Sequence, residues 1–120
     1  MLHHVALEVT PEKIEAERDF WTAVGFRRVE VPEGLDPELV WLERNGSQIH
    51  LLPADSPVIP TDGHAAIVAP EFEDTVGRLE RAGFEVSRRR EYWGAPRAKV
   101  TTPGGHLVEL MAAPPDGKQG

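Results

Sequence analysis

Three histidines and one glutamate stand at positions from which they could hold a metal ion. They are His4, His50, His64 and Glu109. Imidazole nitrogens and carboxylate oxygens are the donors with which proteins bind divalent zinc, nickel, cobalt, iron or manganese. An ion held by three neutral imidazoles and one carboxylate keeps a positive charge, so it can stabilise a developing oxyanion and acidify a bound water. In octahedral geometry two positions stay open, which is enough for two neighbouring substrate oxygens.

The four residues occupy equivalent places in two similar halves of the chain. Segment 4–9 resembles segment 64–69, and each is followed by a proline, an amphipathic stretch and a Gly-Phe pair. Each half then closes with an apolar strand after a glycine turn, at 48–52 and at 107–111. The predicted order in each half is strand, helix and three strands, and this order occurs twice.

The predicted helices run from Pro11 to Gly25 and from Pro70 to Gly83, because proline suits the first helical position and glycine a left-handed cap. Each carries one apolar stripe, made of Ile14, Phe20, Trp21 and Val24 in the first helix and Phe72, Val76 and Leu79 in the second. The expected strands are 4–9, 27–31, 39–43, 47–52, 64–69, 85–89, 97–101 and 106–111. We therefore predict an α+β fold in which two βαβββ modules form an open, curved, eight-stranded sheet around a metal-containing cavity, with the helices outside.

The two modules are expected at residues 1–54 and 63–112, and together they make one domain. A proline-containing linker at 55–62 joins them, and a flexible tail follows at 113–120. Half-modules of about 55 residues are too small to bury a complete core alone. We therefore expect the modules to depend on each other or on a second chain.

Strand alternation places the four candidate ligands on a common face. In the first strand Val5, Leu7 and Val9 are apolar and should face the helix, so His4 faces the other way. The same alternation puts His50, His64 and Glu109 on the face away from the helices. A single strand histidine would usually have no such role, but four ligand-type residues at matched positions predict a metal site. If the halves pair by their approximate twofold symmetry, the four side chains converge.

Other residues of this face could bind the substrate. In strand 97–101, Ala98 and Val100 should face the helix, so Arg97 and Lys99 should point into the cavity and could bind an anionic group. Trp41 and Trp93 are candidates for the walls of the same cavity. Further residues are expected to lie elsewhere: His106 follows a turn and should be exposed, and the arginine run 88–90 should be a solvated surface.

Composition excludes several functional classes. The chain of 120 residues has 20 acidic and 13 basic side chains and a net charge of −7, which disfavours nucleic acids and anionic membrane surfaces as partners. Cysteine is absent, so thiolate metal sites and cysteine nucleophiles are excluded. The longest clean apolar run, 65–69, is far too short to span a membrane. We expect a cytoplasmic protein.

The paired modules resemble the vicinal oxygen chelate superfamily, which includes glyoxalase I, methylmalonyl-CoA epimerase, extradiol dioxygenases, fosfomycin-resistance transferases and bleomycin-resistance proteins. The motifs that carry the resemblance are 2–9, Asp19-Phe20-Trp21 before Gly25-Phe26, 63–67 and 103–110, and it covers nearly all of residues 2–112. The resemblance implies a homodimer and a metal held by His4, His64 and Glu109. His50 departs from it, because glyoxalase I has glutamate and the epimerase glutamine at that position. The sequence is compatible with a site built within one chain and with a site shared between two.

These observations predict a glyoxalase-like, metal-dependent lyase or isomerase. Its small, anionic substrate would chelate one divalent transition ion through adjacent oxygens, and Glu109, the only carboxylate of the set, would move a carbon-bound proton. One alternative is a metal-free protein that sequesters a ligand, as bleomycin-resistance proteins do. Another is a ring-cleaving dioxygenase or a thiol transferase, although a fourth ligand at His50 leaves little room for a diol and dioxygen together.

Overall fold

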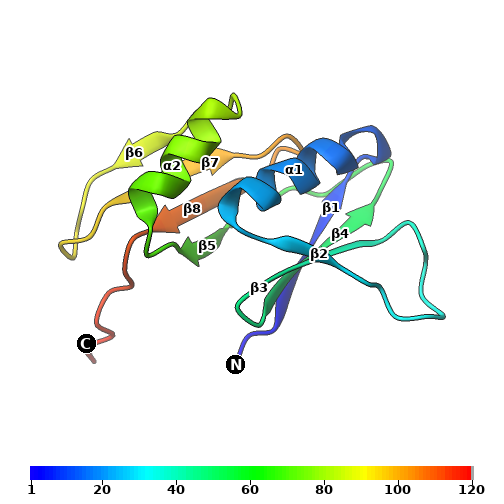
Figure 1. The fold of residues 1–120 in the computed structure, drawn as a ribbon, viewed down its shortest axis with the longest axis horizontal. Helices are drawn as coiled ribbons and strands as arrows, with labels where there is room; N and C mark the ends of the chain where they lie inside the picture. Colours follow the sequence, from blue (N-terminus) through cyan, green and yellow to red (C-terminus); the bar gives the residue numbers. More distant parts are fainter. Residues whose placement is uncertain (120) are drawn as a thin grey trace.

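The computed structural model describes residues 1–119 and shows two βαβββ modules (Figure 1). The elements are β1 (His4–Val9), η1 (Pro11–Lys13), α1 (Ile14–Val24), β2 (Arg27–Val29), β3 (Val40–Arg44), β4 (Ser47–Pro53), β5 (Ala65–Val68), α2 (Phe72–Arg81), β6 (Ser87–Arg89), β7 (Arg97–Thr101) and β8 (Leu107–Met111). Module 1 comprises β1 to β4 and module 2 comprises β5 to β8. The predicted α+β class and the repeated order of elements are confirmed.

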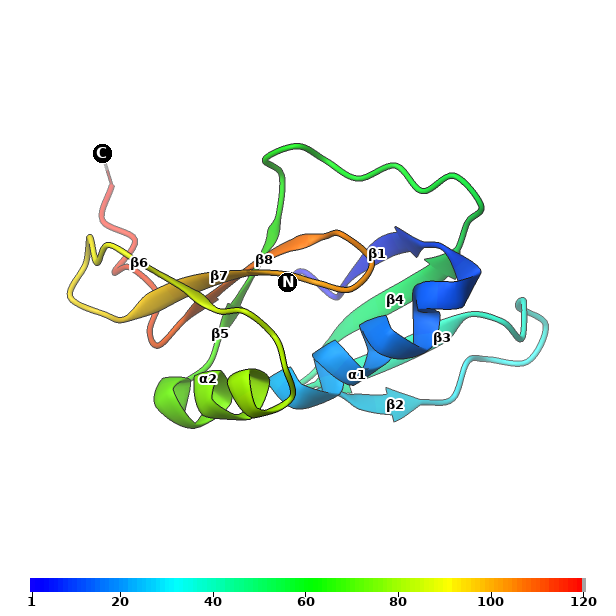
Figure 2. The ribbon, with the colours of Figure 1, turned by 90° about the horizontal axis from the view of Figure 1, so that it is seen from above.

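Each module contains one four-stranded sheet with the same topology. The strand orders are β1-β4-β3-β2 and β5-β8-β7-β6. The first and last strands of each module pair in parallel, and the other neighbours are antiparallel. Among residues 1–119 no ladder joins the two sheets, so β1 and β5 are both edge strands. Figure 2 shows the sheets diverging, with the linker crossing from the end of β4 to the start of β5.

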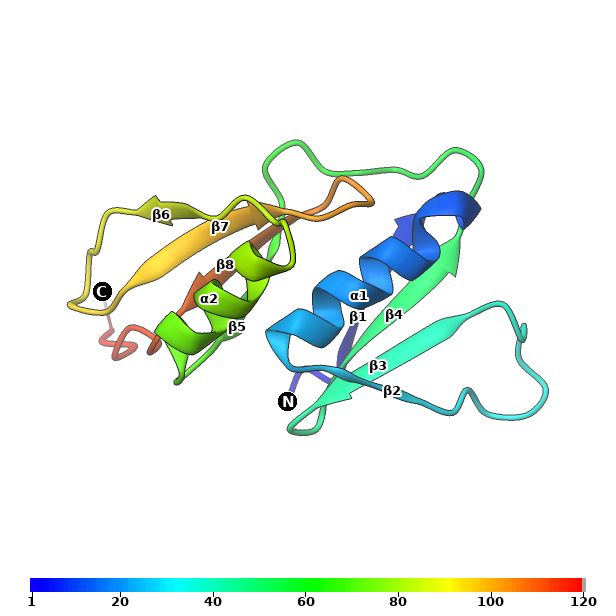
Figure 3. The same cartoon turned by 45° about the horizontal axis from the view of Figure 1, so that its top comes forward.

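The helices hold the two modules together. α1 and α2 lie side by side over the sheets and contact each other (Figure 3). Their predicted stripes are buried, and one apolar cluster joins residues of both modules, including Phe20, Trp21, Val76 and Leu79. Shared burial explains why neither half needs a complete core of its own. No helix in the described part of the chain has the length and apolarity to cross a membrane.

The turn between β7 and β8 docks on module 1 through buried polar contacts. Glu17 of α1 is fully buried, and its carboxylate accepts hydrogen bonds from the Gly104 N–H at 2.7 Å and from Trp21 Nε1 at 3.1 Å. His106 donates from Nε2 to the carbonyl oxygen of Glu8 at 2.8 Å. The expectation that His106 is exposed is therefore wrong, because the turn folds back onto β1 and buries the ring.

Candidate metal and substrate site

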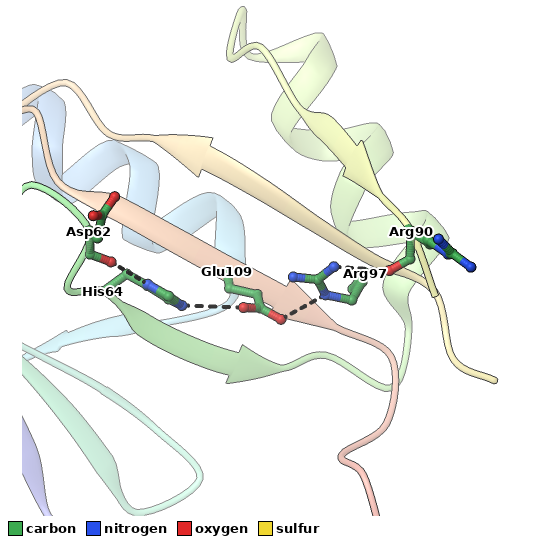
Figure 4. A network of polar contacts seen from close by, with 5 residues as sticks. All are labelled: Asp62, His64, Arg90, Arg97 and Glu109. Atoms are coloured by element: carbon green, nitrogen blue, oxygen red, sulfur yellow. Dashed lines mark hydrogen bonds and ion pairs between the residues drawn. The ribbon is translucent and has the colours of Figure 1, made fainter. Parts of the chain in front are cut away.

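Module 2 aligns His64, Glu109 and Arg97 in one row on the open face of its sheet (Figure 4). His64, just before β5, donates from Nδ1 to the carbonyl oxygen of Asp62 at 2.8 Å. Its Nε2 lies 3.3 Å from Oε1 of Glu109 on β8. In the neutral ring Nε2 then has no proton, so an imidazole lone pair faces a carboxylate oxygen. Two atoms that each bind the same metal ion at about 2.1 Å lie about 3.0–3.4 Å from each other. The 3.3 Å between His64 Nε2 and Glu109 Oε1 falls in this range.

Arg97 fixes the other carboxylate oxygen. Its Nε donates to Oε2 of Glu109 at 3.1 Å, and its Nη1 donates to the carbonyl oxygen of Arg90 at 2.9 Å. Burial raises the pKa of Glu109, but the hydrogen bond and charge of Arg97 outweigh burial and hold that pKa below its usual value. Glu109 is therefore a carboxylate at neutral pH.

The loop before β7 packs its aromatic rings around this arginine. The guanidinium carbon of Arg97 lies 5.8 Å from the ring centroids of both Tyr92 and Trp93. Trp93 also donates from its indole nitrogen to the carbonyl oxygen of Ala113 at 2.8 Å, which ties the loop to the segment after β8. These contacts hold the Arg97 guanidinium in place beside Glu109.

Module 1 presents a stack of rings at the equivalent place. The His50 ring lies between Trp41 and His4, with centroid separations of 3.9 Å and 4.0 Å and interplanar angles of 4° and 15°. Sequence alternation left the side of Trp41 undecided, and the register places it directly opposite His50 on the open face. His3 lies at the end of this stack, its Nδ1 3.0 Å from that of His4.

Hydrogen bonds orient the His50 ring and identify the ring nitrogen that carries the proton. Its Nε2 donates to Oε1 of Gln48 at 2.7 Å, and the amide of Gln48 donates to Glu43 at 3.0 Å. Burial, followed by the charges of His4 and His3, lowers the pKa of His50 to about 4. The ring is therefore neutral at pH 7, with Nδ1 unprotonated, and this is the form that binds metal ions.

Within one chain the four candidate ligands form two pairs rather than one cluster. His4 and His64 both line a hollow of about 290 Å³ between the two modules. Across residues 1–119, however, no three side chains of the His, Cys, Asp or Glu type lie close enough to hold an ion. Each pair has donors that suit a divalent ion, but a single chain does not assemble the complete set.

Comparison with known proteins identifies the family. Residues 1–110 match the profile of the Glyoxalase/Bleomycin resistance protein/Dioxygenase superfamily. The chain belongs to this superfamily. The comparison with curated proteins found no match.

Solved structures share the fold of this superfamily member at low sequence identity. A protein of the glyoxalase family from Bacillus anthracis is 21% identical, with a TM-score of 0.82, covering 92% of this chain and 93% of its own. The fosfomycin resistance protein FosX from Listeria monocytogenes is 20% identical, with a TM-score of 0.73 and coverage of 95% and 91%. A glyoxalase/dioxygenase from Nostoc punctiforme is 19% identical, with a TM-score of 0.75 and the same coverage.

Several neighbours of the candidate ligands in this superfamily member were not foreseen. Gln48 accepts a hydrogen bond from His50 and donates one to Glu43, and the Asp62 carbonyl accepts one from His64. Gln48 stands two residues from His50 on the same face, so strand alternation could have indicated it. The Asp62 contact depends on how the linker enters β5, which no sequence pattern shows. Lys99 lies directly opposite Glu109 in the sheet register.

Proposed function

We propose that this superfamily member is a metal-dependent lyase or isomerase that acts on a small anionic substrate with adjacent chelating oxygens. Its cofactor would be one divalent ion of zinc, nickel, cobalt, iron or manganese. The observation that carries the proposal is the arrangement of His64, whose Nδ1 donates to the Asp62 carbonyl while Nε2 faces Oε1 of Glu109 at 3.3 Å. A backbone acceptor on the far nitrogen is how ligating histidines are usually oriented.

A second copy of the chain would complete the ligand set. His4 and His50 lie in module 1, and His64 and Glu109 lie in module 2, so the pairs are complementary. The edges of β1 and β5 have no partner strand within residues 1–119. A twofold dimer that sets module 1 of one copy against module 2 of the other would form two identical sites. Exposed apolar side chains near these edges, such as Leu2, Val58 and Val68, support an interface there.

The side chains of the site have separable roles in this proposal. The bound ion would act as a Lewis acid on the substrate oxygens. Lys99 would attract the anionic substrate, while Arg97 is already engaged with Glu109. Glu109 would take a carbon-bound proton and return it to a neighbouring atom. Because its pKa is held low, Glu109 is a weak base, so the substrate proton must be unusually acidic.

A metal-free, ligand-sequestering protein is the second candidate. The parallel rings of Trp41, His50 and His4 form a flat aromatic platform, which suits the binding of a planar ligand by stacking. This candidate needs none of the acid–base chemistry of Glu109, so it predicts that ligand binding is independent of metal and of that carboxylate.

Metal content and proton exchange separate the two candidates. Protein purified without chelator is expected to contain about one transition ion per chain, measured by elemental analysis, and the Glu109→Gln variant is expected to lose it. Glu80→Gln, an exposed carboxylate on α2, is the control and should keep the ion. Absence of metal in the wild-type protein, with none taken up on titration, would contradict the enzyme proposal.

The reaction class is tested on hydroxypyruvate, which has adjacent hydroxyl, carbonyl and carboxylate oxygens. The metal-loaded protein is expected to accelerate exchange of its carbon-bound protons in deuterium oxide, followed by proton NMR, and Glu109→Gln to abolish the acceleration. Metal-loaded protein that leaves the exchange rate of hydroxypyruvate unchanged would argue against proton transfer on this substrate class.

A further inference from the structure

The arginine run 88–90 is divided by strand alternation rather than lying together on the surface. Arg88 faces α2, where it makes two hydrogen bonds to the Glu73 carboxylate, at 2.6 Å and 3.1 Å. Arg90 follows β6 and lies over the Tyr92 ring, 5.4 Å from its centroid. Arg89 pairs in register with Arg97, so it shares the open face of module 2 with Glu109. Only the middle arginine of the run therefore points toward the site.

Positive charge exceeds negative charge on this face. Arg89 lies directly opposite Arg97, and like charges at directly opposed positions destabilise a sheet. Lys99, two residues along β7 on the same face, adds a third cation. Glu109 neutralises Arg97, and no described carboxylate forms an ion pair with Arg89 or Lys99. An anion bound here would relieve this repulsion.

A hollow of about 310 Å³ lies at these residues and extends to Leu107 at the start of β8. Its lining includes Ser87, Arg89, Lys99 and Thr101, together with the carboxylate residue Glu85. Ser87 lies directly opposite Lys99 in the register. Two cations and two hydroxyl groups are the donors that a tetrahedral oxyanion requires, and the single carboxylate leaves the lining with a net positive charge.

We infer that Ser87, Arg89 and Lys99 form an oxyanion subsite that binds a phosphate group. Neighbouring strands are about 4.8 Å apart, so the subsite, which spans β6 and β7, lies about 5–10 Å from Glu109 on β8. The substrate would then be a small organic phosphate, with its chelating oxygens near His64 and Glu109 and its phosphate at the rim of the sheet. The assignment of this phosphate to the substrate rests on the proposed function, whereas the subsite itself does not.

Phosphate binding can be measured on the metal-free protein, so failure of the metal proposal would not affect the result. Chelator-treated, ¹⁵N-labelled protein is titrated with inorganic phosphate at constant ionic strength, with chloride as the replaced anion. We expect saturable shifts of the amide resonances of residues 85–89 and 99–101. Arg89→Ala and Lys99→Ala should each weaken phosphate binding about tenfold, as expected for loss of a charged hydrogen bond.

The control is Arg28→Ala, an exposed arginine on the equivalent edge strand of module 1. It should leave the affinity for phosphate unchanged. Equal weakening by Arg28→Ala would show a general charge effect and overturn the subsite, as would the absence of saturable shifts in the wild-type protein. Acetate should bind more weakly than phosphate, and equal affinity would overturn the assignment to phosphate. The amide spectra of the variants report whether they are folded.

Discussion

The open faces of the two modules share one topology but differ in chemistry. The face of module 1 carries stacked rings, with a neutral His50 between Trp41 and His4. The face of module 2 carries charges, with Glu109 between His64 and Arg97. The repeated βαβββ scaffold therefore fixes where side chains can meet, whereas the residue types decide what they do.

The difference makes the two faces complementary. Module 1 offers neutral nitrogen donors and an aromatic surface, and module 2 offers a carboxylate and free cations. Neither face contains three candidate ligands, and residues 1–119 bring no three together. The two modules therefore share a fold but differ in their polar residues. A metal site that uses residues of both faces fits this difference.

The largest effect is expected where the charge row of module 2 is broken. In Glu109→Ala the Arg97 guanidinium, whose side chain is 13% exposed, loses its carboxylate partner. An unpaired charge at a buried position costs about 3 kcal/mol of unfolding free energy, measured by urea denaturation of metal-free protein. A carboxylate on the open face of module 1, Glu43, pairs with the exposed Arg27 and accepts a hydrogen bond from Gln48, so Glu43→Ala should cost only about 1 kcal/mol. Equal costs would contradict the contrast between the faces.

The next largest effect on stability is expected at the contact between Gly104 and Glu17, which joins the two modules. A Cβ on Gly104 would lie 2.8 Å from Oε1 of Glu17 and 3.1 Å from Val9, so Gly104→Ala should destabilise the protein by about 1–3 kcal/mol. Gly77→Ala in α2 is the control, because its Cβ would approach only the flexible Arg81 side chain. This substitution should be neutral or stabilise by up to about 1 kcal/mol. If Gly104→Ala leaves the unfolding free energy unchanged, the turn between β7 and β8 is not held against α1.

The two faces should also respond differently to pH. His50 has a pKa of about 4 in the folded protein, against 6.5 for an ordinary histidine. Its contribution to stability is therefore complete above pH 6.5 and is lost as the pH falls toward 4. We expect histidine NMR titration of metal-free protein to give this low value and Trp41→Ala to raise it by exposing the ring. In His50→Gln the loss of stability between pH 6.5 and 4 should be smaller than in the wild-type protein.

Glu109 should affect stability over a lower pH range than His50. Its folded pKa lies below the ordinary carboxyl value of 4.5, so its contribution is present above pH 4.5 and is lost as the pH falls through the folded value. The stability difference between the wild-type protein and Glu109→Gln should therefore shrink only below pH 4.5. A difference that shrinks already at pH 6 would contradict the pairing of Glu109 with Arg97.

The smallest effect concerns the two tryptophans. Trp93→Phe removes the hydrogen bond to the Ala113 carbonyl and should lower the unfolding free energy by about 1 kcal/mol. Trp41→Phe keeps a ring against His50 and should cost less than that. Thermal denaturation of the two variants is the measurement, and a larger cost for Trp41→Phe would mean that the stack contributes more than the loop contact.

Much of this arrangement follows from the sequence by strand alternation. Alternating apolar residues predicted that His4, His50 and Glu109 lie on the sheet faces away from the helices. The strand registers agree with this placement. The apolar stripes of the helices were also predictable, because apolar residues recur at helical spacings, as at Phe72, Val76 and Leu79 in the second helix. β2 and β6 are shorter than predicted. Each is an edge strand, so its length is set by how far it pairs with its single neighbouring strand rather than by its own sequence.

Contacts between modules could not be read from the sequence. The burial of His106 and the bond from Gly104 to Glu17 both depend on how the turn between β7 and β8 packs on β1 and α1. The separation of the ligands into pairs has the same origin, because α1 and α2 set the angle between the sheets. Local patterns place a side chain on a face, but only tertiary packing decides which faces meet.

The sharing of one metal site between two copies is tested most directly by complementation. His4→Ala and Glu109→Ala chains are co-expressed with different histidine-free tags, and the heterodimer is purified through both tags and titrated with zinc. A shared site predicts about one tight zinc ion per heterodimer, because one of its two sites keeps every ligand, and none in either variant homodimer. A heterodimer that binds no more zinc than the variant homodimers would contradict the shared site.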